Sequence, residues 1–274
     1  MHLFRNTHTI EILESRIAPA AVTLSFFDQD SKVVSVTSSK GTIGDLQTAV
    51  GVASGATAAG VLSFQFGAIF KGADITVTAG ANATDVITTR IGFINAAGID
   101  LGKLTIDGEL DRINAGDTNS ATAALKSLTV GSWGNGTLPA TVGQFDSEVV
   151  GAITTLSVQG DFNGGYLLVR GSDSFDPPPS LHLTDVQGKI GSLFIGGSLL
   201  GTARENGGHI FATGDIAKIT VVGSVRGFAA PKTPAMAPTD QNFNARIFSG
   251  GLINSLVIGT DAVPGSLVGG DGLS

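Results

Sequence analysis

Five charged residues gather around a proline-rich stretch in the second half of the chain: Arg170, Asp173, Asp176, Asp185 and Lys189. Clustered carboxylates suit Ca²⁺, and a basic side chain beside them suits removal of the proton next to a substrate carboxylate. Polysaccharide lyases and hydrolases use such groups. A solvated loop has the same composition, and these residues match no catalytic motif. We therefore predict no catalytic residue among them.

Other residue types that carry chemistry give no stronger signal. The four histidines are His2, His8, His182 and His209. No H-x-x-H spacing is present and the chain has no Cys, so we expect each histidine to be structural or solvent-facing. The pairs Gly196-Gly197 and Gly207-Gly208 belong to no GxGxxG, and no G-x-S-x-G is present. We expect no enzyme activity and no cofactor.

Aspartates recur where turns are expected, and they raise the question of calcium. They are Asp107, Asp111, Asp117, Asp161, Asp215 and Asp261. Acidic turns bind calcium in some extracellular repeats. Asp also favours turns and blunts exposed strand edges for purely structural reasons. We favour the structural role, and the sequence leaves metal binding open.

The elements that position these residues are expected to be short strands. The 274 residues include 39 Gly and few charged side chains, and hydrophobic residues make up 42%. This composition favours strands separated by tight turns. The net charge of −7 disfavours binding to nucleic-acid phosphates. Without Cys there are no disulfides, so stability must come from packing.

A phrase of the form Φ-x-Φ-x-G, in which Φ is apolar, occurs six times, with the Gly one position early in the second and sixth copies. It begins at Leu104, Leu128, Leu156, Leu193, Ile219 and Leu256, at spacings of 24 to 37 residues. A related phrase precedes it by nine or ten residues. That second phrase begins at Ile94, Ile210 and Ile247, with a weaker match at Leu183, and Ile113 interleaves with the series.

These repeats predict an all-β fold, a parallel β-helix. Alternation points every second side chain inward, and Gly supplies a positive φ or a close backbone approach. One short strand cannot bury its apolar face alone, whereas stacked copies can. A sandwich or propeller is the alternative, and Asn135-Gly136, Asn163-Gly164 and Asn206-Gly207 are hairpin-type dipeptides. They occupy no constant place in the repeat, so we favour the β-helix.

The region before the repeats is expected to form a β-rich cap. Residues 22–39 resemble a hairpin with Asp28 to Ser31 at its turn. Asp45 is placed to cap one short helix whose Leu46, Ala49, Val50 and Ala53 share a face. The charge-free run from Leu46 to Phe70 has the length of a membrane span, but polar residues dilute it and VLSFQF alternates as a strand does. We expect no membrane span.

The N-terminal residues 13–20 read LESRIAPA. This motif resembles the LEPR-x-LL or LESRIAPA motif of β-repeat surface or secreted proteins of the Planctomycetes and Verrucomicrobia. The segment GFINAAGIDLGKLTIDGEL is similar to the repeats of that family. The acidic turn of the family is often Asp-x-Asp-Gly-Asp, which Ser31 and Lys32 interrupt here. The resemblance implies a place in the envelope or outside the cell, and it implies no activity.

We therefore expect three regions: a tail at 1–21, a β-rich capping region at 22–90, and solenoid repeats at 91–274 that continue in a longer protein. The expected function is a secreted or cell-surface structural or interaction β-solenoid. The alternatives are a carbohydrate-binding or polysaccharide-degrading β-helix and a calcium-stabilised adhesin. Expected partners are other envelope proteins, glycans, or a second copy end-on, because an uncapped solenoid end exposes unpaired strand edges.

Overall fold

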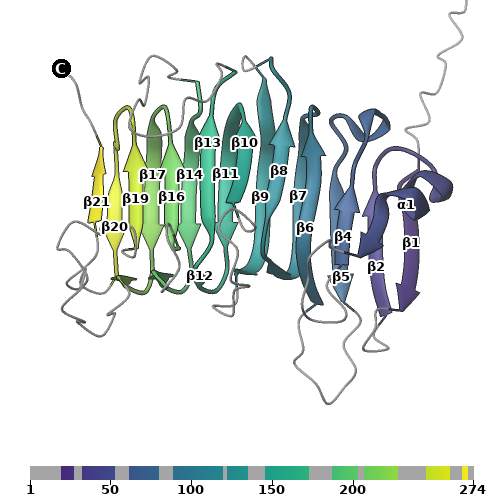
Figure 1. The fold of residues 1–274 in the computed structure, drawn as a ribbon, viewed down its shortest axis with the longest axis horizontal. Coiled ribbons are helices and arrows are strands. Elements are labelled where there is room, and N and C mark those ends of the chain that lie inside the picture. The colour runs from purple at the N-terminus through teal and green to yellow at the C-terminus, as the bar shows by residue number, and fades with distance from the viewer. Residues whose placement is uncertain are drawn as a thin grey trace, which may run out of the picture.

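The computed structural model of the protein describes residues 20–27, 33–52, 62–79, 89–119, 122–134, 146–172, 187–202, 207–227, 245–259 and 267–270. In this part of the chain, mostly parallel strands form one curled sheet that winds into a solenoid, with one α-helix near its N-terminal end (Figure 1). Colour follows chain order along the long axis, so each coil stacks on the one before it. The predicted all-β parallel β-helix with a short helix in its cap is confirmed.

Each coil contributes strands to two long faces. Face A consists of β4 (Leu62–Gln65), β6 (Thr89–Ala97), β8 (Ile113–Gly116), β10 (Asp146–Val150), β13 (Tyr166–Arg170), β16 (His209–Ala212), β19 (Arg246–Ser249) and β21 (Leu267–Gly270). Face B consists of β5 (Ile75–Ala79), β7 (Leu101–Leu110), β9 (Ala123–Trp133), β11 (Ala152–Val158), β14 (Ile190–Ile195), β17 (Ile216–Val221) and β20 (Leu256–Ile258). Successive strands on each face pair in parallel.

A short third face, face C, closes the cross-section. Its separate strands are β12 (Phe162–Asn163), β15 (Leu199–Leu200) and β18 (Val225–Arg226). The end of β9 continues into this face, because Trp133 pairs with Phe162. Earlier in the stack, the end of β7 pairs with the beginning of β6. Face C has no counterpart in the sequence prediction.

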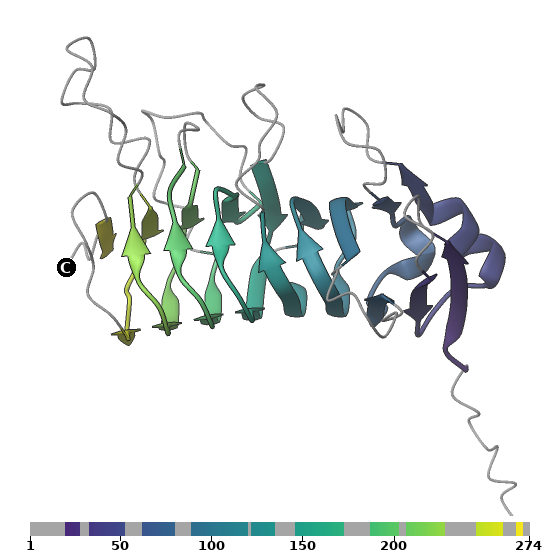
Figure 2. The same ribbon diagram turned by 90° about the horizontal axis from the view of Figure 1, so that it is seen from below.

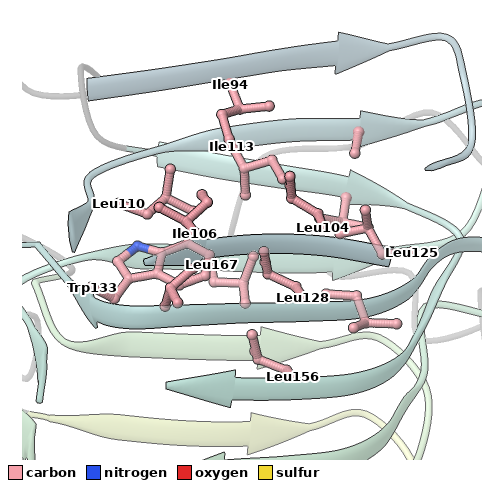
Figure 3. Close-up of a cluster of buried hydrophobic side chains, with 14 of the residues drawn as sticks. Ile94, Leu104, Ile106, Leu110, Ile113, Leu125, Leu128, Trp133, Leu156 and Leu167 are labelled. Carbon is pink, nitrogen blue, oxygen red and sulfur yellow. The ribbon is translucent and has the colours of Figure 1, made fainter. Parts of the chain in front are cut away.

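The first residues of the repeated phrase form one continuous column inside the solenoid. Leu104 pairs with Leu128, Leu128 with Leu156, and the series continues through Leu193, Ile219 and Leu256. Figure 3 shows Leu104, Leu128 and Leu156 following one another through the core. On face A, Ile94 pairs with Ile113 and Ile210 with Ile247, as the second phrase predicts. Leu183 lies outside the described residues, and Leu167 pairs with Ile210 in this column.

The glycine of the repeated phrase is needed because the coils approach each other closely. A Cβ on Gly196 would lie 2.1 Å from the carbonyl oxygen of Gln159 in the preceding coil. A Cβ on Gly131 would lie 2.7 Å from the carbonyl oxygen of Gly108. Neither residue has a positive φ, so close approach, rather than a special turn, explains why Gly recurs here.

Antiparallel strands and one helix cover the N-terminal end of the stack. Strands β1 (Val22–Phe27) and β2 (Val33–Ser38) form the expected hairpin, and β2 pairs with β5. The helix α1 (Ile43–Ala49) buries Leu46 and Ala49, and β3 (Val50–Val52) pairs with β4. Figure 2 shows these purple elements across the N-terminal end. A short 3₁₀ turn, η1 (Ala68–Phe70), follows β4.

The helix cap differs from the sequence prediction in one respect. Thr42, not Asp45, is the N-cap residue, and its hydroxyl accepts a hydrogen bond from the Asp45 N–H. The Asp45 carboxylate accepts from the Thr42 N–H in return, which completes a capping box. Val50 leaves the helix face because it begins β3, and Ala53 lies outside the described residues.

Parallel stacking begins before residue 91. Strands β4 and β5 already pair in parallel with β6 and β7, so part of the expected capping region contributes a coil. The Asn163-Gly164 dipeptide joins β12 to β13 at a corner of the coil, and both strands run parallel to their neighbours. It is therefore not a hairpin turn. Among the described residues, no helix is long and apolar enough to cross a membrane.

Candidate functional site

The described part of the charged cluster from which catalysis was considered consists of Arg170, on the outer side of face A, and Lys189, directly before β14 of face B. Arg170 ends β13, and its Nε donates to Glu148 Oε1 at 2.5 Å while its Nη1 donates to the carbonyl oxygen of Gly171 at 2.9 Å. Lys189 contacts Asp215 instead, at 3.4 Å. Asp173, Asp176 and Asp185 lie outside the described residues. The two described basic residues thus have separate acidic partners and do not converge on one substrate position.

Aromatic and charged side chains line face A beside this ion pair. Tyr166, His209 and Arg246 occupy equivalent positions in successive coils and point outward, because the next residue in each strand belongs to the inward column. The ring centroids of Tyr166 and His209 lie 6.4 Å apart. His209 is nonetheless buried, so the prediction of a structural role fits it better than a solvent-facing one.

A second outward column continues this surface. Phe211 and Phe248 stack with ring centroids 4.5 Å apart, and the Arg246 guanidinium carbon lies 5.3 Å from the Phe248 ring centroid. Leu168 pairs with Phe211 in the same column and is buried. We call Tyr166, Leu168, His209, Phe211, Arg246 and Phe248 the aromatic strip. Phe211, Phe248 and Arg246 contact one another through apolar and cation–π interactions, and Leu168, His209 and Phe248 are buried.

Tyr166 of the aromatic strip is unsuited to proton transfer at neutral pH. Burial raises the pKa of Tyr166 to about 12, and the negative charges of Asp146 and Glu148 act in the same direction. The phenol therefore keeps its proton at neutral pH. A general base needs a pKa near the working pH, which Tyr166 lacks.

The aspartates at the corners of the coils bond to the next coil. Asp161 accepts a hydrogen bond from the Ser198 N–H at 2.6 Å, and Asp215 accepts one from the Leu252 N–H at 2.9 Å. Asp74, which the sequence did not single out, accepts from the Lys103 N–H at 2.7 Å. Each of these carboxylates thus satisfies a backbone donor that the turn leaves without a ladder partner.

Two further aspartates that the sequence analysis considered as calcium ligands form ion pairs. Asp117 pairs with Lys71 at 2.7 Å, and this hydrogen bond is the main reason that the pKa of Asp117 is lowered. Asp111 pairs with Arg90 at 2.9 Å, yet burial outweighs the arginine and raises the pKa of Asp111. Asp107 is exposed on β7, and Asp261 lies outside the described residues. In the described ranges, no three His, Cys, Asp or Glu side chains gather as metal ligands.

The remaining candidates from the sequence are the two glycine pairs and three of the histidines. Gly196 and Gly197 lie at the end of β14, where the preceding coil leaves no room for a Cβ. Gly208 has a φ of +79° at the corner before β16. His2, His8 and His182 lie outside the described residues. The two glycine pairs therefore serve coil stacking, and neither begins a helix.

Comparison with known proteins identifies no relative of this chain. No family model matches the chain, and no match is found among curated proteins or solved structures.

Sequence reasoning missed the aromatic strip. Its members precede or follow the apolar residue of the second phrase, as in Tyr166-Leu167 and Arg246-Ile247. The alternation within the phrase assigns them to the outer side of a strand. Only the register between coils shows that they lie next to one another, and loops of unequal length hide that register in the sequence.

Proposed function

We propose that the protein is a secreted or cell-surface structural and interaction module, a β-solenoid that acts as a scaffold and not as an enzyme. The proposal rests on the hydrogen bonds and ion pairs that the charged side chains form. Asp161 and Asp215 bond to the backbone of the next coil, and Arg170 and Lys189 pair with separate acids. Groups held in this way stabilise the stack and are not arranged around a substrate.

The location rests on the LESRIAPA resemblance at residues 13–20. Partners in this setting are other envelope proteins or glycans, which would meet the outer faces of the solenoid. Face B carries the exposed lysines Lys103, Lys126 and Lys218, which a membrane-impermeant amine reagent can modify. Intact cells that produce the protein should therefore yield the labelled chain. Labelling that requires cell lysis would contradict the proposed location.

Carbohydrate binding without cleavage is the second candidate function, and the aromatic strip favours it. Tyr166 and Arg246 are partly exposed hydrogen-bond donors on one outer face, and the Arg246 guanidinium lies over the buried ring of Phe248. A glycan array probed with the wild-type protein and with Arg246→Ala tests this candidate. Binding that the substitution weakens supports it, and binding that the substitution leaves unchanged assigns glycan recognition to another surface.

Calcium-dependent adhesion is less well supported. The aspartates from which it was considered accept backbone hydrogen bonds or pair with basic residues wherever a partner is described for them. A calcium ion would have to compete with these partners. The calcium dependence of the melting temperature, treated in the Discussion, separates this possibility from the scaffold.

A further inference from the structure

The outer side of face B is positively charged, although the chain as a whole has a net charge of −7. Its strands β7, β9, β11, β14 and β17 follow one another along the solenoid (Figure 1). Before these strands turn into face C, their charged side chains are three lysines and one aspartate, all exposed: Lys103, Lys126, Lys218 and Asp107. None of the three lysines forms an ion pair with another described residue. Face B thus offers positive charge that its own side chains do not neutralise.

Two of these lysines bracket a row of hydroxyl groups. The residues that pair one after another in the five strands are Lys103, Ser127, Thr155, Ser192 and Lys218, which we call the lysine-hydroxyl column. Each member directly precedes a residue of the inward column, so its side chain points outward. The three hydroxyls are partly exposed and form no hydrogen bond to another described residue. Because neighbouring strands are about 4.8 Å apart, the two lysines lie about 19 Å apart along the solenoid.

A second outward column, two residues further along the same strands, extends the polar surface. Its members in successive coils are Thr105, Thr129, Ser157, Phe194 and Thr220. A hydroxyl group both donates and accepts hydrogen bonds, so a surface of hydroxyls suits a ligand that is itself rich in hydroxyls. The single ring of Phe194 does not provide the series of aromatic platforms on which the bases of a single-stranded nucleic acid stack. The two columns together therefore favour a sugar polymer over a nucleic acid.

We propose that face B binds a linear anionic polysaccharide, a polymer of uronic acids that lies along the solenoid axis. Lys103 and Lys218 pair with carboxylates near the two ends of the bound segment, and the hydroxyls between them exchange hydrogen bonds with the hydroxyls of the sugars. The coil spacing of about 4.8 Å is close to the length of one pyranose unit, so successive sugars meet successive coils. Lys126 adds positive charge at the edge of the column.

A polymer suits this surface better than a short sugar, because each contact on an exposed face is weak. An exposed ion pair changes affinity by about fivefold at most. A chain that reaches both lysines makes the second contact without a second loss of translational freedom. A disaccharide covers about two coils and cannot reach both lysines. This ligand goes beyond the proposed function, in which the candidate carbohydrate site is the aromatic strip on face A, and its binding involves no cleavage.

Isothermal titration calorimetry with defined oligosaccharides tests the ligand class. The first probe is the β-1,4-linked hexamer of mannuronic acid, and its neutral counterpart is β-1,4-mannohexaose, which has the same linkage without the carboxylates. We expect the acidic hexamer to bind the wild-type protein, with an affinity that falls as salt is added. The neutral hexamer and the mannuronic acid dimer should each bind about tenfold or more weakly, since the first lacks charge and the second lacks length.

Substitutions in the lysine-hydroxyl column locate the site. Lys103→Gln and Lys218→Gln should each weaken binding of the acidic hexamer about two- to fivefold, and together about tenfold. Thr155→Val, which removes a hydroxyl with little change of shape, should weaken it about twofold or more. Arg226→Gln is the matched control, because it removes the same charge from an exposed side chain on face C and should leave the affinity unchanged. Far-UV circular dichroism confirms that all variants remain folded.

Three results would overturn the inference. The first is a wild-type protein that does not bind the acidic hexamer. The second is binding that the substitutions at Lys103, Thr155 and Lys218 leave unchanged, since the hexamer then uses another surface. The third is equal affinity for a single-stranded oligonucleotide of the same charge, since face B then recognises only charge. None of these results bears on surface labelling or on the effect of Arg246→Ala in the glycan array, so a failure here is distinguishable from a failure of the proposed function.

Discussion

The indole ring of Trp133 at the end of β9 stacks on the phenyl ring of Phe162 in β12 of the next coil, with ring centroids 5.1 Å apart. Both side chains are fully buried, and Trp133 pairs with Phe162 where faces B and C meet. Trp133 is the only tryptophan of the chain. This contact therefore joins two coils through the core and supplies a single fluorescent reporter of their packing.

Phe162→Ala should destabilise the protein by about 3–5 kcal/mol, because it leaves a cavity beside Trp133 and removes the ring contact. Denaturant unfolding followed by circular dichroism measures the loss, and a red shift of Trp133 emission in the native state reports water near the indole. Phe27→Ala is the control, since Phe27 is 71% exposed. It should change stability by no more than about 0.5 kcal/mol. Equal effects of the two substitutions would contradict the assigned core.

Two glycines at neighbouring positions of the repeated phrase, Gly196 at the fourth and Gly160 at the fifth, should respond differently to alanine. A Cβ on Gly196 would lie 2.1 Å from a backbone oxygen, whereas the nearest atom to a Cβ on Gly160 would be 3.1 Å away. Gly196→Ala should cost about 1–3 kcal/mol because backbone must move, and Gly160→Ala should cost clearly less. Thermal unfolding of both variants checks the order. A larger loss for Gly160→Ala would show that the coils are spaced differently.

Asp215 and Asp111 should make the free energy of unfolding depend on pH in opposite directions. The hydrogen bond from the Leu252 N–H lowers the pKa of Asp215. Its carboxylate therefore stabilises the fold above its ordinary pKa, and that stabilisation is lost as the pH falls through the lowered value. Burial raises the pKa of Asp111, so its ionisation costs stability as the pH rises from the ordinary value through the raised one.

The substitutions Asp215→Asn and Asp111→Asn separate these effects, and each variant is the control for the other. Between about pH 3 and 6, Asp215→Asn should reduce the gain in unfolding free energy with rising pH, and Asp111→Asn should increase it. Unfolding curves at several pH values measure both slopes. Slopes that shift in the same direction for both variants would contradict the assigned environments.

Calcium should leave the melting temperature unchanged. A ligand that binds only the folded state stabilises it by an amount that grows with the ratio of its concentration to Kd. Asp161 and Asp215 already accept backbone hydrogen bonds, so no such gain is expected from them. Differential scanning calorimetry with millimolar calcium and with chelator makes the comparison. A melting temperature that rises with calcium concentration would favour the calcium-stabilised adhesin instead.

The inward columns were predictable because their signal is repeated. Leu104, Leu128 and Leu156 each begin the same short phrase, and stacking is the simplest way for all of them to be buried. The weak match at Leu183 shows the limit of this reasoning. Leu167 belongs to the face A column beside Ile210, because a long insertion separates β13 from β14 and shifts the apparent spacing.

Face C and the aromatic strip were not predictable for different reasons. A two-residue strand such as Phe162–Asn163 has no periodicity to detect, so only its neighbours across the coils define it. The strip depends on which outward residues become adjacent, as Phe211 and Phe248 do. That adjacency follows from register between coils, and not from the order of residues within one coil.

The central claim is that this solenoid is a scaffold without catalytic activity, and a polysaccharide-degradation screen tests it most directly. The wild-type protein is incubated with a panel of acidic and neutral polysaccharides, with and without calcium, and the release of reducing ends and unsaturated products is measured. We predict no release above that of a heat-unfolded sample of the same protein. Release that Arg170→Ala abolishes, in a variant whose circular dichroism matches the wild type, would contradict the claim and restore a catalytic role to the charged groups on face A.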